Sequence, residues 1–221
     1  MSELLTVLAG PQALVQLRDG GWNADAFSTL LGASGGPKWL VLSRMDRVLA
    51  EQFVSPRSRP LSMVGSSIGT FRHLCHAQKD PVAALERFEE AYIAQAYDTE
   101  PTPREVSRES ERVIQILFGE LGREEVLSNA SIATHIVAVR SRAAAASDRR
   151  LPLAIGLGAA AMANAIDRRL LAAFFERAVF HTGANSRLEF RGFGTQNVSL
   201  TRQNLDAAAL AWAMLSSIGL G

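Results

Sequence analysis

The sequence has almost no net charge, a single cysteine and no long uncharged apolar run. Its 23 Lys and Arg residues and 22 Asp and Glu residues leave a formal charge of +1. This balance gives no electrostatic reason to expect nucleic acid or an acidic partner. Cys75 has no second cysteine, so an intrachain disulfide and a thiolate zinc cluster are both excluded. We therefore expect a reducing, cytoplasmic setting.

Recognisable targeting and membrane-spanning segments are also missing. The apolar stretch at residues 4–9 is too short for a signal peptide, and it follows Glu3 where a signal peptide would have lysines. The longest apolar stretch, residues 151–165, ends before Asp167, Arg168 and Arg169. It falls short of the roughly 18 residues that a membrane span needs. We expect a chain that does not span a membrane, while peripheral binding to a lipid surface stays open.

Apolar periodicity predicts strands that alternate with helices. The composition, 48% hydrophobic and 20% charged over 221 residues, is that of one globular domain covering residues 1–221. The alternation predicts an α/β fold with a mainly parallel sheet, interrupted by a helical insert at about residues 80–121. Strands are predicted at residues 26–32, 61–64, 131–140, 178–182 and 197–201, helices at residues 38–52, 68–78, 81–97, 102–121, 159–177 and 204–216, and a loop at residues 143–146.

A G-x-S-x-G pattern follows the second predicted strand and opens a helix. It runs from Gly65 to Gly69 with Ser67 at its centre. Glycines on both sides of the serine allow a sharp strand-to-helix turn that lifts the hydroxyl clear of the sheet. The N–H groups and positive dipole end of the following helix then favour negative charge beside that oxygen. Ser67 is therefore a candidate nucleophile, with the Ile68 amide as a candidate donor.

A glycine-rich loop follows the first predicted strand, between Gly32 and Trp39. Adjacent glycines at Gly35 and Gly36 let backbone N–H groups point outward with no Cβ in the way. The loop does not match a nucleotide phosphate loop, because Pro37 and Trp39 stand where glycine and Ser or Thr would be needed. We interpret it as an oxyanion hole. Both loops follow neighbouring strands and should meet at the carboxyl edge of the sheet, where ligands bind in open α/β folds.

The two loops together resemble those of the patatin-like phospholipase family. That family has an oxyanion loop of the form G-G-G-x-[KR]-G, then G-x-S-x-G, then an Asp-Gly motif near the C-terminal end. The resemblance places residues 34–39 in the oxyanion loop with Lys38 at its basic position, and Ser67 at the nucleophile. It implies a patatin-like three-layer α/β architecture and lipid acyl hydrolysis by a Ser–Asp dyad. It implies no catalytic histidine, no metal and no organic cofactor.

The sequence departs from the family pattern at three points. Ser34 and Trp39 each replace a glycine of the oxyanion loop. Residues 207–218 resemble the small-residue segment that precedes the family aspartate, but no acid in the sequence matches that aspartate. We expect that the chain is shorter than its gene product; a disordered remainder and a degenerate family member are the alternatives. Asp19 and Asp206 are weak candidates for the acid, since a surface turn and a helix cap account for them.

The remaining polar and aromatic candidates have plainer explanations. His73 and His76 follow Ser67 on one predicted helix without an apparent third metal ligand. His135 and His181 belong to predicted strands, and Cys75 suits a buried position. Packing is the expected role of all five. Trp39, beside the oxyanion loop, is a candidate for lining an acyl pocket.

The hypothesis from the sequence is a lipid acyl hydrolase with a serine nucleophile, acting on a lipid or ester substrate. Two alternatives stay open. One is an α/β-hydrolase with a Ser–His–acid triad, for which His135 or His181 would have to reach Ser67. The other is a non-catalytic lipid- or protein-binding module on the same fold. The helices of the insert are expected to shape a lipid-access face, and nucleic acid is not expected as a partner.

Overall fold

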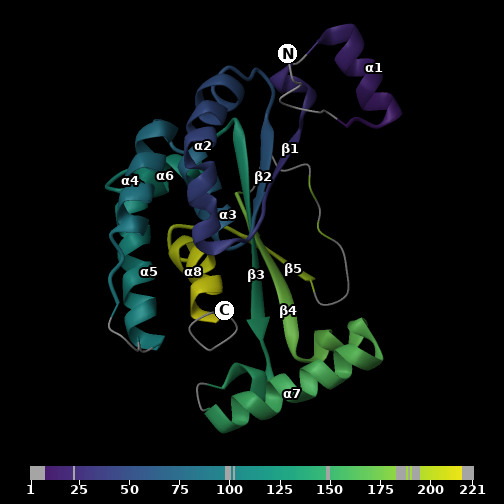
Figure 1. Cartoon of the computed structure of the whole chain (residues 1–221), viewed down its shortest axis with the longest axis vertical. Coiled ribbons are helices and arrows are strands. Elements are labelled where there is room, and N and C mark those ends of the chain that lie inside the picture. Colours follow the sequence, from purple (N-terminus) through teal and green to yellow (C-terminus); the bar gives the residue numbers. More distant parts are fainter. Residues whose placement is uncertain are drawn as a thin grey trace.

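The computed structural model describes residues 8–21, 23–97, 101, 103–147, 150–182, 188, 190 and 195–215. They form a five-stranded sheet with helices packed against it (Figure 1). The strands are β1 (Thr29–Gly32), β2 (Leu61–Gly65), β3 (Ile132–Ser141), β4 (Phe175–His181) and β5 (Thr195–Ser199). The helices are α1 (Pro11–Gly20), α2 (Ser43–Leu49), α3 (Ile68–His76), α4 (Pro81–Ile93), α5 (Pro103–Phe118), α6 (Gly122–Ser128), α7 (Arg150–Ile166) and α8 (Leu205–Leu215).

The sheet is mainly parallel, with strands in sequence order from β1 to β5. β1, β2 and β3 run parallel, β4 is antiparallel to β3, and β5 is parallel to β4. Helices connect β1 to β2 and β2 to β3, as crossover connections between parallel strands require. The predicted α/β fold with a mainly parallel sheet flanked by helices is confirmed, and the arrangement is consistent with a three-layer architecture.

The hydrophobic core lies between the sheet and helices α3 to α6 and α8. α3 packs against β1, β2 and β3, and α8 packs against β3. Met63 and Ile136 of the sheet, with Leu74, Phe88 and Leu117 of the helices, are at most 2% exposed. In Figure 1 these helices gather beside the upper half of the sheet, while α7 lies apart at the far end of β3 and β4. The core therefore supports β1, β2 and the turns that follow them.

Several short elements differ from the prediction. The expected helix at residues 38–52 is divided into a 3₁₀ segment (Gly36–Leu42), α2 and a π-helical turn (Ala50–Val54). The expected loop at residues 143–146 forms a 3₁₀ turn, η4 (Ala143–Ala146), and α6 was not predicted. α6 has only seven residues, which is too short for a clear helical period.

The predicted helix at residues 159–177 is wrong in both of its limits. α7 begins at Arg150 with Pro152 in its first turn, where proline is tolerated, and it ends at Ile166. The side chain of Asp167 accepts the N–H of Arg169 and starts a separate 3₁₀ helix, η5 (Arg168–Ala173). Pairing of Phe175 with Ser141 then begins β4, so sheet pairing overrides the helical pattern there.

The structure also bears on the membrane prediction. No helix among the described residues combines the length and the apolar character that crossing a bilayer requires.

Candidate active site at the carboxyl edge of the sheet

Ser67 lies in a sharp turn between β2 and α3, and its backbone is strained. Its φ of 55° and ψ of −130° make it the one non-glycine residue with positive φ among the residues described. An L side chain rarely adopts that conformation, which costs about 1–3 kcal/mol and persists where the surroundings enforce it. Strand, turn and helix therefore follow each other as the G-x-S-x-G pattern predicted.

The two glycines of the pattern are required by close backbone contacts. A Cβ at position 65 would lie 2.6 Å from the Cα of Thr70, inside the following helix. A Cβ at position 69 would collide with the carbonyl group of Gly32. The first turn of α3 therefore presses directly on the end of β1, which fixes Ser67 relative to the loop that begins there.

Hydrogen bonds join the Ser67 turn to the glycine-rich loop. The N–H of Ser66 donates to the carbonyl oxygen of Gly32 at 3.1 Å, and Ser34 Oγ lies 3.2 Å from Ser66 Oγ. Within the loop, Gly35 is extended with φ 179°, and Gly36 has a φ of 51° that glycine tolerates and other residues rarely adopt. The two segments thus form one polar rim.

Gly35, Gly36 and Ile68 contribute three backbone N–H groups at the starts of the two helices on this rim. Ile68 is the first residue of α3 and Gly36 the first of its 3₁₀ helix, so neither N–H has an acceptor within its own helix. Gly35 precedes Gly36 as the cap of that helix. The amides of Gly69 and Thr70, in contrast, close the turn on the carbonyls of Ser66 and Ser67.

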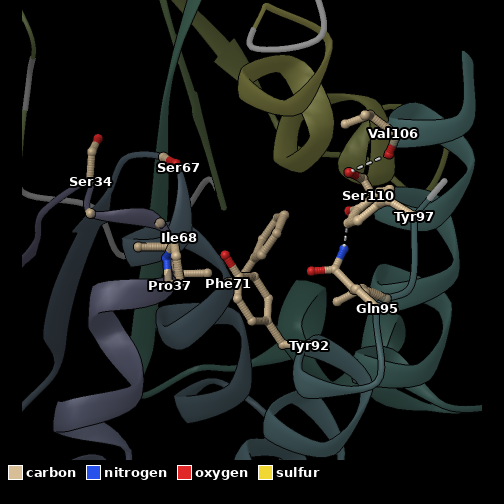
Figure 2. A pocket seen from close by; sticks show the side chains of 13 residues that line it. Ser34, Pro37, Ser67, Ile68, Phe71, Tyr92, Gln95, Tyr97, Val106 and Ser110 are labelled. Carbon is tan, nitrogen blue, oxygen red and sulfur yellow. Dashed lines mark hydrogen bonds between the residues drawn. The ribbon is translucent and has the colours of Figure 1, made fainter. Parts of the chain in front are cut away.

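A cavity of about 570 Å³ opens beside Ser67 (Figure 2). The glycine-rich loop and the start of α3 form one wall, and α4, α5 and the segment between them form the other. No carboxylate or imidazole is present among the described lining residues, most of which present apolar or hydroxyl groups. They are Ser34, Gly35, Gly36, Pro37, Ser67, Ile68, Phe71, Tyr92, Gln95, Tyr97, Val106, Ser110 and Val113.

Four of the five predicted site residues meet at this cavity, and one does not. Gly35, Gly36, Ser67 and Ile68 all line it. Lys38 is exposed and is not among the lining residues, so its assignment to the family's basic position stays a prediction.

The hypothesis that Trp39 lines an acyl pocket is wrong. Its side chain is 2% exposed and stacks on Phe88, with ring centroids 4.6 Å apart. It also meets Tyr92 edge to face at 5.8 Å. Because Tyr92 does line the cavity, Trp39 supports that wall from behind.

Sequence patterns did not identify the side chains of the far wall. Tyr92, Gln95 and Tyr97 come from the end of α4 and the residues after it, and Gln95 Nε2 donates to Tyr97 Oη at 2.8 Å. Burial raises the pKa of both tyrosines, which therefore stay neutral around pH 7. The one available signal was the helical insert itself, which was expected to shape an access face.

None of the four histidines lines the described part of the cavity. The His73 ring packs against Gly32, and burial lowers its pKa to about 3. His76 lies 3.9 Å from Asp46, which is held by Arg72 at 2.5 and 2.6 Å. No group of three potential metal ligands occurs among the described residues.

The other two histidines and Cys75 have packing contacts of their own. His135 Nδ1 lies 3.1 Å from the Ala133 carbonyl oxygen, and its ring stacks on His181 at 6.2 Å. Cys75 is fully buried, its thiol donates to the Ala84 carbonyl oxygen at 3.6 Å, and burial raises its pKa. The contacts described for His135 and His181 connect neither ring to Ser67.

The two candidates for the catalytic acid, Asp206 and Asp19, have other positions or partners in the structure. Asp206 accepts from Arg123 at 2.8 and 2.9 Å at the start of α8, so its carboxylate is engaged in an ion pair. Asp19 lies on α1, whose end borders Ser58 and Arg59 before β2, at the opposite edge of the sheet from Ser67. Residues 216–218, the end of the small-residue segment, lie outside the described residues.

Comparisons with protein-family models, with curated proteins and with solved structures find no match for this chain.

Proposed function

We propose that this chain is a serine-dependent acyl hydrolase of the patatin-like kind, acting on carboxylic esters of lipids. The observation that supports the proposal most is the strained Ser67, held at the mouth of an apolar cavity beside backbone N–H groups. Backbone strain concentrates at functional sites, and here it presents a hydroxyl to the cavity.

In the proposed reaction, Ser67 Oγ attacks the ester carbonyl carbon and loses its proton to a base. The amides of Gly35, Gly36 and Ile68 donate to the oxyanion of the tetrahedral intermediate, and each such donor contributes a rate factor of about 10²–10³. The C–O bond then breaks, the alcohol leaves with a proton, and water hydrolyses the acyl-serine. By resemblance, the base is the aspartate of a C-terminal Asp-Gly motif, and no acid in this sequence matches that position, since Asp19-Gly20 has the letters of the motif but precedes the first strand.

The cavity favours a lipid ester over a small polar one. Ile68, Phe71, Tyr92, Val106 and Val113 present mostly hydrocarbon to a volume of about 570 Å³. Burying an acyl chain there gains about 0.8 kcal/mol per methylene group. A reducing, cytoplasmic location with peripheral contact to membranes belongs to the same proposal, supported by the free, buried thiol of Cys75.

A second candidate function is a non-catalytic lipid-binding module. The observation that favours it is the absence of any carboxylate or imidazole from the described lining of the cavity. A binding module needs the apolar cavity and has no use for a base.

Intact-mass labelling with a fluorophosphonate tests the proposal. We expect one adduct on the native chain and none on Ser67→Ala. Ser66→Ala is the matched control, because Ser66 neighbours the nucleophile, contacts Ser34 and is not among the lining residues. Equal labelling of native chain and Ser67→Ala would contradict the proposal. No adduct, together with binding of a fluorescent fatty acid, would favour the binding module.

The pH dependence of labelling distinguishes a carboxylate base in the protein from hydroxide as the group that removes the Ser67 proton. If hydroxide removes the Ser67 proton, the rate rises about tenfold per unit between about pH 7 and pH 9. If a carboxylate of ordinary pKa does so, it is already ionised in this range and the rate stays flat. We expect the rising profile for the chain as printed, after subtraction of the Ser67→Ala background.

A further inference from the structure

An exposed apolar stripe runs along α7. Leu151, Ile155, Met162 and Ile166 are 72%, 61%, 72% and 78% exposed. Their spacing of four, seven and four residues puts them on one face of the helix. Leu170 of η5, a segment that contacts α7, is also 45% exposed. Residues 151–166 contain no charged side chain.

The opposite face of α7 is occupied by its own flanking segments. A Cβ at Gly156 would collide with the backbone N of Ala145, so helix and η4 are in direct backbone contact. Ala160 is buried on the same side, and α7 also contacts η5. The stripe therefore points away from the only described elements that α7 packs against closely. Exposed apolar surfaces of this kind mark interaction sites.

The segments on either side of α7 in the chain carry exposed arginines. Arg168 and Arg169 directly follow α7 and are exposed, as are Arg140 of β3 and Arg177 of β4. The described carboxylates of this region are engaged. Asp167 accepts the N–H of Arg169 at 2.8 Å. Glu176 is 5% exposed and lies 2.7 Å from Arg142.

We infer that α7 docks this protein onto the surface of a bilayer that contains anionic lipid. Apolar side chains with arginines beside them fit the boundary between acyl chains and anionic headgroups. At about 1.5 Å per residue, the 17 residues of α7 extend about 26 Å, so the helix lies in the interface and does not cross it. Association with a second copy through this stripe would bring arginines near arginines, which opposes it.

The docking face and the Ser67 turn share the carboxyl side of the parallel strands. Gly65, the last residue of β2, pairs with Ile136, and β3 continues for five residues to Ser141. At about 3.3 Å per residue, this extension carries the end of β3 about 17 Å beyond Gly65. Figure 1 shows α7 at that end of β3. A bilayer bound by α7 would thus lie beyond the edge of the sheet at which the cavity opens. The inference concerns binding and holds whether or not Ser67 reacts.

Vesicle flotation of the full chain tests the inference. One set of vesicles is pure phosphatidylcholine, and the other contains about 30% phosphatidylserine, which gives an anionic surface. We expect binding to the anionic vesicles that weakens at high salt and is at least about tenfold stronger than binding to neutral ones. The double variant Ile155→Glu/Met162→Glu should lose at least about tenfold in affinity. Arg168→Gln/Arg169→Gln should lose about 30-fold, since each arginine contributes about 1 kcal/mol, or about fivefold.

The matched control is Leu121→Glu, which changes a 64% exposed leucine on the other side of the core. It should bind anionic vesicles like the native chain, and all variants should keep native circular dichroism and fluorophosphonate labelling. Met162→Cys provides a direct readout. Since Cys75 is fully buried, an environment-sensitive dye attached at position 162 should shift to the blue on anionic vesicles.

Three outcomes would overturn the inference. Equal vesicle binding by the native chain and Ile155→Glu/Met162→Glu would place the lipid contact elsewhere. A native dimer that dissociates in this variant, without vesicle binding, would assign the stripe to a second copy. A variant that unfolds several degrees earlier, again without native vesicle binding, would show that the chain itself covers the stripe.

Discussion

The two halves of β3 lie in regions that differ in whether their apolar side chains are buried or exposed. Near its first half, the region around Ser67 buries them, as Met63, Leu74 and Phe88 show. The second half of β3 belongs to the distal arm, which comprises residues 137–179 and includes α7. In this arm an apolar stripe is exposed to solvent. The Ser67 region therefore derives its geometry from packing, whereas the arm keeps apolar area free for a partner. Changes in the first region should affect stability and the site together, and changes in the arm should affect binding.

Gly69→Ala should have the largest effect. Its Cβ would collide with the carbonyl group of Gly32, and neither backbone can move without separating the Ser67 turn from the glycine-rich loop. We expect a loss of at least about 3 kcal/mol in the free energy of unfolding, at the upper end of overpacking costs. Urea denaturation measures it. Fluorophosphonate labelling of the folded fraction should also slow.

The control for Gly69→Ala is Gly119→Ala, in the turn after α5. A Cβ there meets nothing within 4 Å, although its φ of 55° adds strain. It should cost about 1 kcal/mol through that strain and leave labelling unchanged. Equal destabilisation by the two variants would mean that contact with β1 does not hold the Ser67 turn.

Acidification should weaken the Ser67 region through His73. Burial lowers the pKa of this imidazole to about 3, while the unfolded chain titrates near 6.5. The unfolded state therefore binds the proton first, so stability is full above pH 6.5 and falls as the pH drops toward 3. Between pH 6.5 and 5 the loss from His73 should be about 2 kcal/mol, at about 1.4 kcal/mol per pH unit.

Urea denaturation of the native chain and His73→Gln at both pH values checks this prediction. The variant should lose much of the pH dependence. It should retain a part, because burial also lowers the pKa of His135 and acts in the same direction. The distal arm contains no histidine. An unchanged pH dependence in the variant would mean that His73 accepts a proton without unfolding.

The sequence predicted the Ser67 region well because its signals are local. The turn needs glycine at positions 65 and 69 for contacts within a few residues or with the neighbouring strand end, so the pattern alone indicated the geometry. Strands β1 to β3 were likewise predicted within a few residues of their limits. The far wall of the cavity was not, since Tyr92, Tyr97 and Val113 meet only when α4 and α5 pack together.

Tertiary contacts also explain why the arm was predicted poorly. Residues 159–177 have a helical pattern, yet pairing with β3 converts Phe175 and the residues after it to a strand. Trp39 was misjudged for a similar reason. Its neighbours in sequence line the cavity, but packing on Phe88 turns the indole into the core. Neither outcome follows from periodicity along the chain.

Gly158→Ala should have the smallest effect on stability. Whether a substitution stabilises or destabilises α7 distinguishes the free face of this helix from the packed one. Nothing lies within 4 Å of a Cβ at position 158, so the variant should stabilise α7 by about 0.5–1 kcal/mol through helix propensity. Hydrogen exchange of the α7 amides should slow by about threefold to fivefold. Gly156→Ala, two residues earlier on the packed face, should instead speed exchange, because its Cβ collides with Ala145. Slower exchange in both variants would mean that η4 does not hold α7 in place, and an arm that is free to turn could not present one fixed face to a bilayer.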